Sequence, residues 1–298
     1  MTVNLELISE HRCHGGWQRY YQHPSEAIGL PMKFSVFLPE QTHATSAKED
    51  SANPMGVTKR PVLIYLAGLT CTEDTFTTKA GAQQYAAEHG LILVTPDTSP
   101  RGAGAPGEDD NWDFGTGAGF YLDATTPDFS KHYRMESYVA DELFSLVTTV
   151  LPGDAERVGI FGHSMGGHGA LVLALRHPDK FKSVSAFAPI AAPTQCPWGE
   201  KAFTGYLGTD RQTWQEHDAS CLMKNLSRAP YPKGILIDQG LADQFLEREL
   251  HPHLFEEACA KVAQPLTLRR HAGYDHGYFF IMTFMQDHIK HHAQQLEA

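Results

Sequence analysis

The stretch VGIFGHSMGG at residues 158–167 decides the fold of this chain. Its first half is a short apolar run of the kind that forms buried strands. Its second half places Gly162 and Gly166 two residues before and two residues after Ser164, and the apolar segment 169–175 follows. The pattern predicts a strand, a tight turn and a helix. Because side chains at the two glycine positions would collide with neighbouring backbone in such a turn, the glycines have a steric purpose.

This order is typical of the nucleophile elbow of an α/β-hydrolase. The turn lifts the Ser164 hydroxyl above the sheet, and free N–H groups at the start of the helix point to the same place. The alternative is a Gly-rich turn whose serine only caps the helix. The strand before the motif and the helix after it favour the elbow.

An elbow serine requires an acid and then a histidine later in the chain. The apolar run 234–238 predicts a strand followed by a loop with Asp243, and 265–270 predicts the next strand, followed by a loop with His276. Because the carboxyl ends of parallel strands face one edge of a sheet, these loops can meet at Ser164. His276 would take the serine proton and later give it to the leaving group.

Three carboxylates are candidates for orienting the histidine and stabilising its charged form. We favour Asp243, because its loop reaches outward toward the site. Asp238 lies at the strand end, where it would brace the loop. Asp275 adjoins His276, where it would hold its own loop.

An oxyanion hole requires backbone N–H donors on two loops. One donor follows the nucleophile and belongs to Met165. The other comes from the loop after an earlier strand, predicted here at 61–66. We assign it to Leu69, because the preceding Gly68 lets the backbone bend toward the substrate oxygen.

The remaining apolar runs predict a mostly parallel sheet, since they are continuous and separated by helical segments. They are 62–66, 91–94, 158–161, 184–188, 235–237 and 266–268. The first 40 residues alternate instead, as in Lys33–Leu38, which predicts antiparallel edge strands. We therefore expect an α/β-hydrolase fold with helices on both faces, in a single domain covering 1–298.

Three segments are predicted to be loops. Residues 42–59 contain a polar run rich in serine and alanine, which indicates an exposed loop. Residues 101–125 and 194–225 are expected to form loops beside the active site. The acidic run within the first of these lacks the spacing of a calcium loop.

Four side chains of these two loops are candidates for the substrate pocket. Trp112 and Phe120 would wall a small acyl pocket, and Trp198 and Lys201 would lie over the site. The alternative is that the aromatic residues belong to the core and that the lysine is solvated.

Composition and charge exclude several classes of protein. The net charge of −11 argues against a nucleic-acid partner. No apolar run approaches a membrane span and the N-terminus lacks a signal-peptide pattern, so we expect a cytoplasmic protein without membrane contact. The five cysteines are an odd and sparse set, which favours reduced thiols.

Most of the histidines are not expected to take part in chemistry. His291 and His292, near the C-terminus, are expected to be solvated. His11, Cys13 and His14 have no second ligand cluster with zinc spacing. We therefore expect neither a metal nor a cofactor.

Beyond the elbow, several stretches resemble the S-formylglutathione hydrolases of the esterase D family. The resemblance extends from about residue 5 to the C-terminus, and the stretches other than the elbow are particular to this family. Besides the elbow itself, Gly162–Gly169, the matching stretches are Gly68–Glu73, Gly117–Thr125, Asp238–Gly240 with Asp243–Phe245, and Gly273–His276.

The resemblance implies a catalytic triad of Ser164, Asp243 and His276. It also implies Leu69 and Met165 as the oxyanion donors. The expected activity is hydrolysis of S-formylglutathione to formate and glutathione, in glutathione-dependent formaldehyde detoxification, by a cytoplasmic homodimer.

The resemblance further implies that alkylation of Cys71 or its conversion to a mixed disulfide inhibits the enzyme. The alternative is that Cys71 is only a small buried hydrophobe. Cys71 is not the nucleophile, because the elbow carries a serine.

Two features depart from the family pattern. Residues 43–59 form a longer connection than is usual in the family. Glu136 stands where an aromatic residue is expected, and it would alter the pocket floor or a helix contact.

Two other functions remain alternatives to the thioester hydrolase. One is a carboxylesterase or acyltransferase of broader specificity that uses the same triad. The other is a non-catalytic scaffold with a hydrolase fold, which an intact triad argues against.

Overall fold

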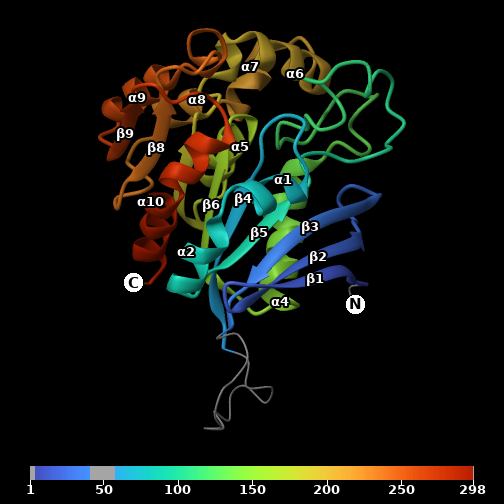
Figure 1. The fold of residues 1–298 in the computed structure, drawn as a ribbon. Coiled ribbons are helices and arrows are strands. Elements are labelled where there is room, and N and C mark those ends of the chain that lie inside the picture. Colours follow the sequence, from blue (N-terminus) through green and yellow to red (C-terminus); the bar gives the residue numbers. More distant parts are fainter. Residues whose placement is uncertain (1–3, 41–57, 298) are drawn as a thin grey trace.

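The computed structural model describes residues 4–40 and 58–297. The predicted loop at 42–59 therefore lies outside the described residues, except for its last two positions. The described residues form a sheet of nine strands, in the order β1-β2-β3-β5-β4-β6-β7-β8-β9 (Figure 1). The strands are β1 Glu6–Cys13, β2 Gly16–Pro24, β3 Pro31–Leu38, β4 Arg60–Leu66, β5 Ile92–Pro96, β6 Gly153–His163, β7 Phe181–Phe187, β8 Ile235–Gly240 and β9 Leu266–His271.

The sheet is antiparallel at one end and parallel elsewhere, as predicted. β1, β2, β3 and β5 pair antiparallel in that order. β5, β4, β6, β7, β8 and β9 pair parallel. Each of the six apolar runs identified in the sequence contributes to one of these parallel strands.

Helices cover both faces of the sheet (Figure 1). α2 and α10 pack together in front of the sheet in this view, whereas α4 and α5 lie behind it. The helical elements are α1 Glu73–Lys79, α2 Ala82–His89, α3 Met135–Ser137, η2 Tyr138–Leu143, α4 Phe144–Thr149, α5 Met165–Arg176, η3 Pro193–Gln195, α6 Pro197–Leu207, α7 Arg211–Trp214, η4 Gln215–His217, α8 Ala219–Lys224, η5 Leu246–Leu250, α9 Pro252–Lys261 and α10 Tyr278–Leu296.

The strand register brings the predicted site loops to one edge. His163 at the end of β6 lies beside Phe187 of β7, and Phe187 lies beside Asp238 of β8. Asp238 in turn lies beside Arg269 of β9. The three loops that carry the serine, the acid and the histidine therefore begin at nearly the same level of the sheet.

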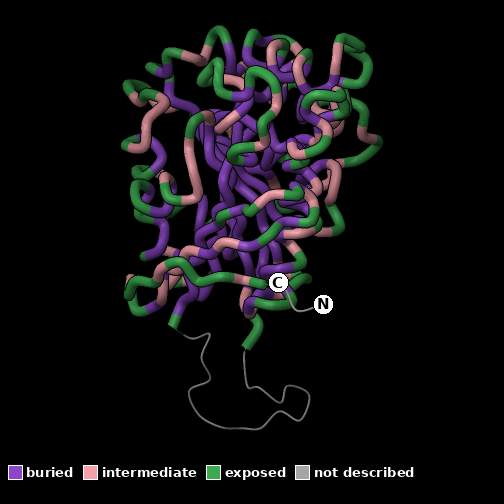
Figure 2. Tube along the Cα trace, turned by 90° about the vertical axis from the view of Figure 1, so that its right-hand side faces the viewer, coloured by how far each residue is buried: buried purple, intermediate pink, exposed green. Residues whose placement is uncertain are grey.

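The core is continuous through the sheet and the inner faces of the helices (Figure 2). It includes polar groups that the sequence did not reveal. His292 is fully buried and hydrogen bonds to Ser183 (2.6 Å) and Ser185 (2.8 Å) on β7. His291 is mostly buried and contacts the Val184 carbonyl. The prediction that these two histidines are solvated is therefore wrong, because both lie on the part of α10 that packs against the sheet.

The segment 194–225 is not a loop. It contains α6, α7 and α8 joined by short turns, so Trp198 and Lys201 lie on a helix. Pro197 is the first residue of α6, and the Cys196 sulfur accepts a hydrogen bond from a backbone N–H of its first turn. By contrast, 101–125 lies outside the helices and the nine sheet strands, as predicted.

Candidate active site

Ser164 occupies a strained turn between β6 and α5. Its backbone has φ 58° and ψ −119°, a conformation that non-glycine residues rarely adopt. Its N–H donates to the Phe187 carbonyl (3.0 Å), and its own carbonyl accepts from the His168 N–H (2.9 Å). The surrounding backbone thus holds the serine in this strained geometry.

The two elbow glycines are required by close backbone contacts. A Cβ on Gly162 would lie 2.2 Å from the Gly166 carbonyl oxygen, and a Cβ on Gly166 would lie 1.9 Å from the Leu66 carbonyl oxygen. Both distances are far below van der Waals contact. The steric purpose predicted for these glycines is confirmed.

Asp243 and His276 are joined by a short hydrogen bond. The distance between His276 Nδ1 and Asp243 Oδ2 is 2.5 Å. The other carboxylate oxygen, Oδ1, accepts from the Phe245 N–H (2.8 Å), and Gln239 Nε2 donates to Oδ2 (3.2 Å). With its side chain buried, the Asp243 carboxylate is fixed on both oxygens and can orient the imidazole.

The imidazole of His276 lies beside the elbow. Its ring centroid is 4.3 Å from that of His163, the residue before Ser164. Its Nε2 is buried and makes no hydrogen bond to another described residue. The nitrogen that a general base would use is therefore not occupied by a competing group of the described chain.

The other two carboxylates have structural roles. Asp238 is fully buried and pairs with Arg269 at 2.6 Å and 2.5 Å, as well as with His271 and His288. Burial opposes its charge, but the hydrogen bonds from Arg269 and His288 outweigh burial and hold the pKa of Asp238 far below its ordinary value. Asp275 is exposed and accepts from the Gly277 N–H (2.9 Å). Both therefore brace their loops.

The loop after β4 packs directly on the serine. A Cβ on Gly68 would lie 3.2 Å from Ser164 Cβ, so only a glycine allows this approach without a shift. The Tyr121 hydroxyl donates to the Ala67 carbonyl (2.8 Å), which fixes the start of the loop. Leu69 follows in this loop, and Met165 is the first residue of α5. N–H groups in the first turn of a helix have no intrahelical partner.

Cys71 lies at the far end of the same loop. Its carbonyl accepts hydrogen bonds from Thr98 Oγ1 (2.6 Å) and Arg101 Nη2 (3.0 Å). Burial raises the pKa of the Cys71 thiol, although hydrogen bonds with Thr75 and Tyr278 act in the opposite direction. The thiol is thus protonated near neutral pH and reacts slowly.

The candidate pocket residues fall into two groups. Trp112 is exposed, and its ring packs nearly perpendicular to that of Trp198, with centroids 5.7 Å apart. Lys201 forms an ion pair with Asp113. These residues line a hollow of about 470 Å³. Phe120, in contrast, is fully buried and packs against His168 and Phe203.

Two further residues of this hollow were not identified from the sequence. The Phe245 ring packs edge-on against His276, with centroids 5.0 Å apart, and lies tilted against Trp198, with centroids 4.7 Å apart. Arg248 lines the same hollow with its side chain 77% exposed. Their position just after the acid was the only available signal.

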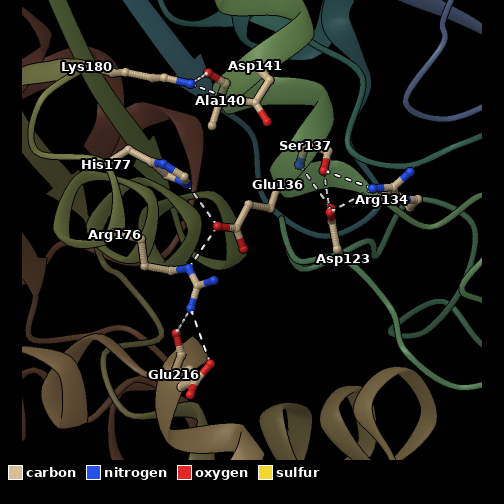
Figure 3. Close-up of polar contacts among 10 residues, drawn as sticks. All are labelled: Asp123, Arg134, Glu136, Ser137, Ala140, Asp141, Arg176, His177, Lys180 and Glu216. Carbon is tan, nitrogen blue, oxygen red and sulfur yellow. Dashed lines mark hydrogen bonds and ion pairs between the residues drawn. The ribbon is translucent and has the colours of Figure 1, made fainter.

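Glu136 makes a helix contact at the opposite end of α5 (Figure 3). Its Oε1 accepts from Arg176 Nε (2.8 Å) and pairs with His177 Nε2 (2.9 Å). Burial alone would raise the pKa of Glu136, but these two partners outweigh it and hold that pKa below its ordinary value. Of the two effects expected from this departure, the helix contact is confirmed.

The described residues contain neither a cluster of metal ligands nor a helix that could span a membrane. No group of three or more histidine, cysteine or acidic side chains there could hold a metal ion. No helix of residues 4–40 and 58–297 combines the length and the apolar character that a membrane crossing requires.

Known proteins match this chain over most or all of its length. The model of the family Esterase ("Putative esterase") matches residues 25–291. The S-formylglutathione hydrolase of Rattus norvegicus is 49% identical over 297 residues, which cover 99% of this chain and 100% of the rat protein. The Arabidopsis thaliana protein of the same name is 49% identical over 301 residues, covering all of both chains.

A solved structure agrees with these relatives. The S-formylglutathione hydrolase from Agrobacterium tumefaciens superposes with a TM-score of 0.90 at 47% identity, covering 98% of this chain and 99% of that one. The chain therefore belongs to the S-formylglutathione hydrolase family of esterases.

Proposed function

We propose that this protein is a serine thioesterase that hydrolyses S-formylglutathione to formate and glutathione. The observation that carries the proposal is the 2.5 Å hydrogen bond between Asp243 and His276, with the imidazole packed beside the Ser164 elbow. The two relatives, each 49% identical to this chain over nearly its whole length, bear the name of this activity.

In the first half-reaction, Ser164 Oγ attacks the formyl carbon while its proton passes to His276 Nε2. The Leu69 and Met165 N–H groups stabilise the oxyanion of the tetrahedral intermediate. Asp243 stabilises the imidazolium. The C–S bond then breaks, and the departing thiolate takes the proton from His276, which leaves a formyl ester on Ser164.

In the second half-reaction, water attacks the formyl ester and gives a proton to His276 Nε2. The second tetrahedral intermediate collapses and the ester C–O bond breaks. Ser164 Oγ recovers its proton from the imidazolium, and formic acid leaves and gives its proton to solvent to become formate. No metal or redox group is required, because the bonds made and broken are those of acyl transfer to water.

We infer that the protein acts in formaldehyde detoxification as a cytoplasmic homodimer. The five unpaired cysteines support a reducing compartment. The dimer rests on the family resemblance alone, and light scattering of the purified protein tests it.

We further propose that Cys71 is a point of inhibition. Its place in the loop that packs on Ser164 supports this role, since a bulky group on the sulfur would displace the oxyanion donor. Alkylation should inactivate the wild type more rapidly at high pH than at neutral pH, and Cys71→Ala should resist it. Equal inactivation of the variant would contradict the proposal.

A substrate panel tests the main proposal. S-formylglutathione, S-lactoylglutathione and p-nitrophenyl esters should be compared by kcat/KM, and the formyl thioester should be the best substrate. Similar values for all three would favour a broader carboxylesterase instead. The observation that favours this alternative is the volume of the hollow beside the triad, about 470 Å³, which can hold acyl groups larger than formyl.

A further inference from the structure

The hollow beside the active site has features that the triad chemistry does not use. It lies between the loop with Trp112 and Asp113, the start of α6 and the chain that follows Asp243. Its volume of about 470 Å³ greatly exceeds the space that a formyl group needs. We refer to it as the carboxylate hollow.

The carboxylate hollow adjoins the reacting groups through a single side chain. Phe245 lines it and also packs edge-on against the His276 ring, with centroids 5.0 Å apart. The backbone N–H of Phe245 holds the Asp243 carboxylate at 2.8 Å. A thioester whose carbonyl lies at Ser164 can therefore extend its thiol part over Phe245 into the hollow.

The aromatic wall of the hollow suits a peptide. Trp198 packs against Phe245 at 4.7 Å, and Trp112 meets Trp198 at 5.7 Å. Trp198 is 7% exposed, whereas Trp112 is 57% exposed. More than half of the Trp112 surface is thus exposed and can pack on the bound molecule.

Two cationic side chains, Lys201 and Arg248, line the hollow and are partly exposed to solvent, and we call them the rim cations. The Lys201 side chain is 38% exposed and that of Arg248 is 77% exposed. The two acids of the hollow lie deeper and are already engaged. Asp113 pairs with Lys201, and Glu249 accepts from the Trp198 N–H (2.9 Å) and contacts Arg248 at 3.4 Å. Further N–H donors of Lys201 and Arg248 are therefore presented to solvent.

We propose that the carboxylate hollow binds the peptide part of the glutathione thioester, with its two carboxylates at Lys201 Nζ and the Arg248 guanidinium. This inference rests on the proposed function and extends it to the leaving group. The chain carries a net charge of −11, so an anionic substrate requires local cations of this kind. The thiol part then contributes binding energy that a simple ester lacks.

Two substitutions with matched controls test the proposal. Arg248→Gln removes one rim cation, and Arg12→Gln is its control. Arg12 is half-exposed on β1 and likewise contacts one glutamate at 3.4 Å. Lys201→Gln breaks the ion pair with Asp113. Its control, Lys180→Gln, breaks the similar pair with Asp141, which lies beyond the C-terminal end of α5 and away from the elbow (Figure 3).

For each variant, KM should be measured with S-formylglutathione and with p-nitrophenyl acetate, which has no carboxylate. We expect Arg248→Gln and Lys201→Gln each to raise the ratio of the two KM values about 3- to 10-fold, as loss of an exposed charge-assisted contact implies. Added salt should raise the wild-type ratio as well, because it screens exposed charges. The control variants should leave the ratio at its wild-type value.

Inhibition by S-methylglutathione separates this proposal from the proposed function. This thioether cannot be hydrolysed, and its inhibition constant is measured against p-nitrophenyl acetate. Weaker inhibition in both rim variants supports the hollow even if the wild type does not hydrolyse S-formylglutathione. If the wild type hydrolyses the thioester but the rim variants keep its KM ratio and its inhibition constant, the hollow is wrong and the proposed function stands. Absence of inhibition of the wild type also overturns the hollow.

Discussion

Asp243 and His276 lie 33 residues apart, yet His276 Nδ1 is 2.5 Å from the Asp243 carboxylate. They follow the neighbouring parallel strands β8 and β9, whose register pairs Gly240 with His271. The two loops therefore begin level with one another. The sheet, rather than any local sequence contact, brings the acid to the histidine.

Replacing this acid should reduce catalysis without unfolding the protein. Asp243→Asn keeps the size of the side chain but removes the charge that stabilises the imidazolium. We expect kcat to fall by a factor on the order of 10³–10⁴. Asp275→Asn is the control, because its exposed carboxylate only accepts from the Gly277 N–H. A comparable loss in both variants would contradict the assignment of the acid.

The strain at Ser164 predicts a conflict between stability and activity. Ser164→Gly and Ser164→Ala both remove the nucleophile, but only glycine adopts φ 58° and ψ −119° without strain. We expect the glycine variant to exceed the alanine variant in unfolding free energy by roughly 1 kcal/mol, since relief of strain outweighs the added freedom of the unfolded chain. Urea unfolding of the two variants measures the difference, and an alanine variant as stable as the glycine variant would argue against strain.

Replacement of the buried Asp238 should destabilise the fold strongly. Its carboxylate joins Arg269 of β9 to His288 of α10. Asp238→Asn leaves the partly buried guanidinium without its charge partner, and removal of one member of a buried pair typically costs about 3–5 kcal/mol. Denaturant unfolding should show a loss in this range, whereas Asp287→Asn, which removes the exposed partner of Arg269, should cost well under half as much. Equal losses would contradict this account.

Because of its buried histidines, the protein should have a lower free energy of unfolding in mild acid than at neutral pH. Burial lowers the pKa of His168 to about 3 and that of His291 to about 4. Near pH 5 both are mostly neutral in the folded state, whereas in the unfolded chain they take up protons below about pH 6.5. The unfolding free energy should therefore drop between pH 7 and pH 5, by up to ~1.4 kcal/mol per pH unit for each histidine.

Denaturant unfolding at several pH values measures this slope. His168→Gln should reduce the slope of unfolding free energy against pH by the contribution of one histidine. His253→Gln, which changes an exposed side chain, is the control substitution. A wild-type profile that is flat between pH 5 and pH 7 would contradict the prediction.

The sheet and the triad loops could be predicted from the sequence because their signals are local. Continuous apolar runs identify strands that are buried on both faces, and Gly162 and Gly166 identify the turn between them. The topology rule for parallel strands then brings Ser164, Asp243 and His276 to one edge. The structure adds the hydrogen bond that selects Asp243 over Asp238.

What could not be predicted depends on tertiary packing. The segment 194–225 is rich in turn signals, yet its helices form where Trp198 and its neighbours pack beside the site. His291 and His292 resemble surface residues in sequence, but β7 supplies serine hydroxyl and backbone carbonyl partners for them. The contribution of Arg248 to the hollow depends on how the chain turns after Asp243, which no periodicity encodes.

The most direct measurement compares the turnover of S-formylglutathione by the wild type and by Ser164→Ala. We expect the wild type to release formate and glutathione and kcat of the variant to fall by a factor on the order of 10⁶, with the folded structure retained. A variant that keeps the wild-type rate would show that Ser164 is not the nucleophile, and the proposed chemistry would fail with it.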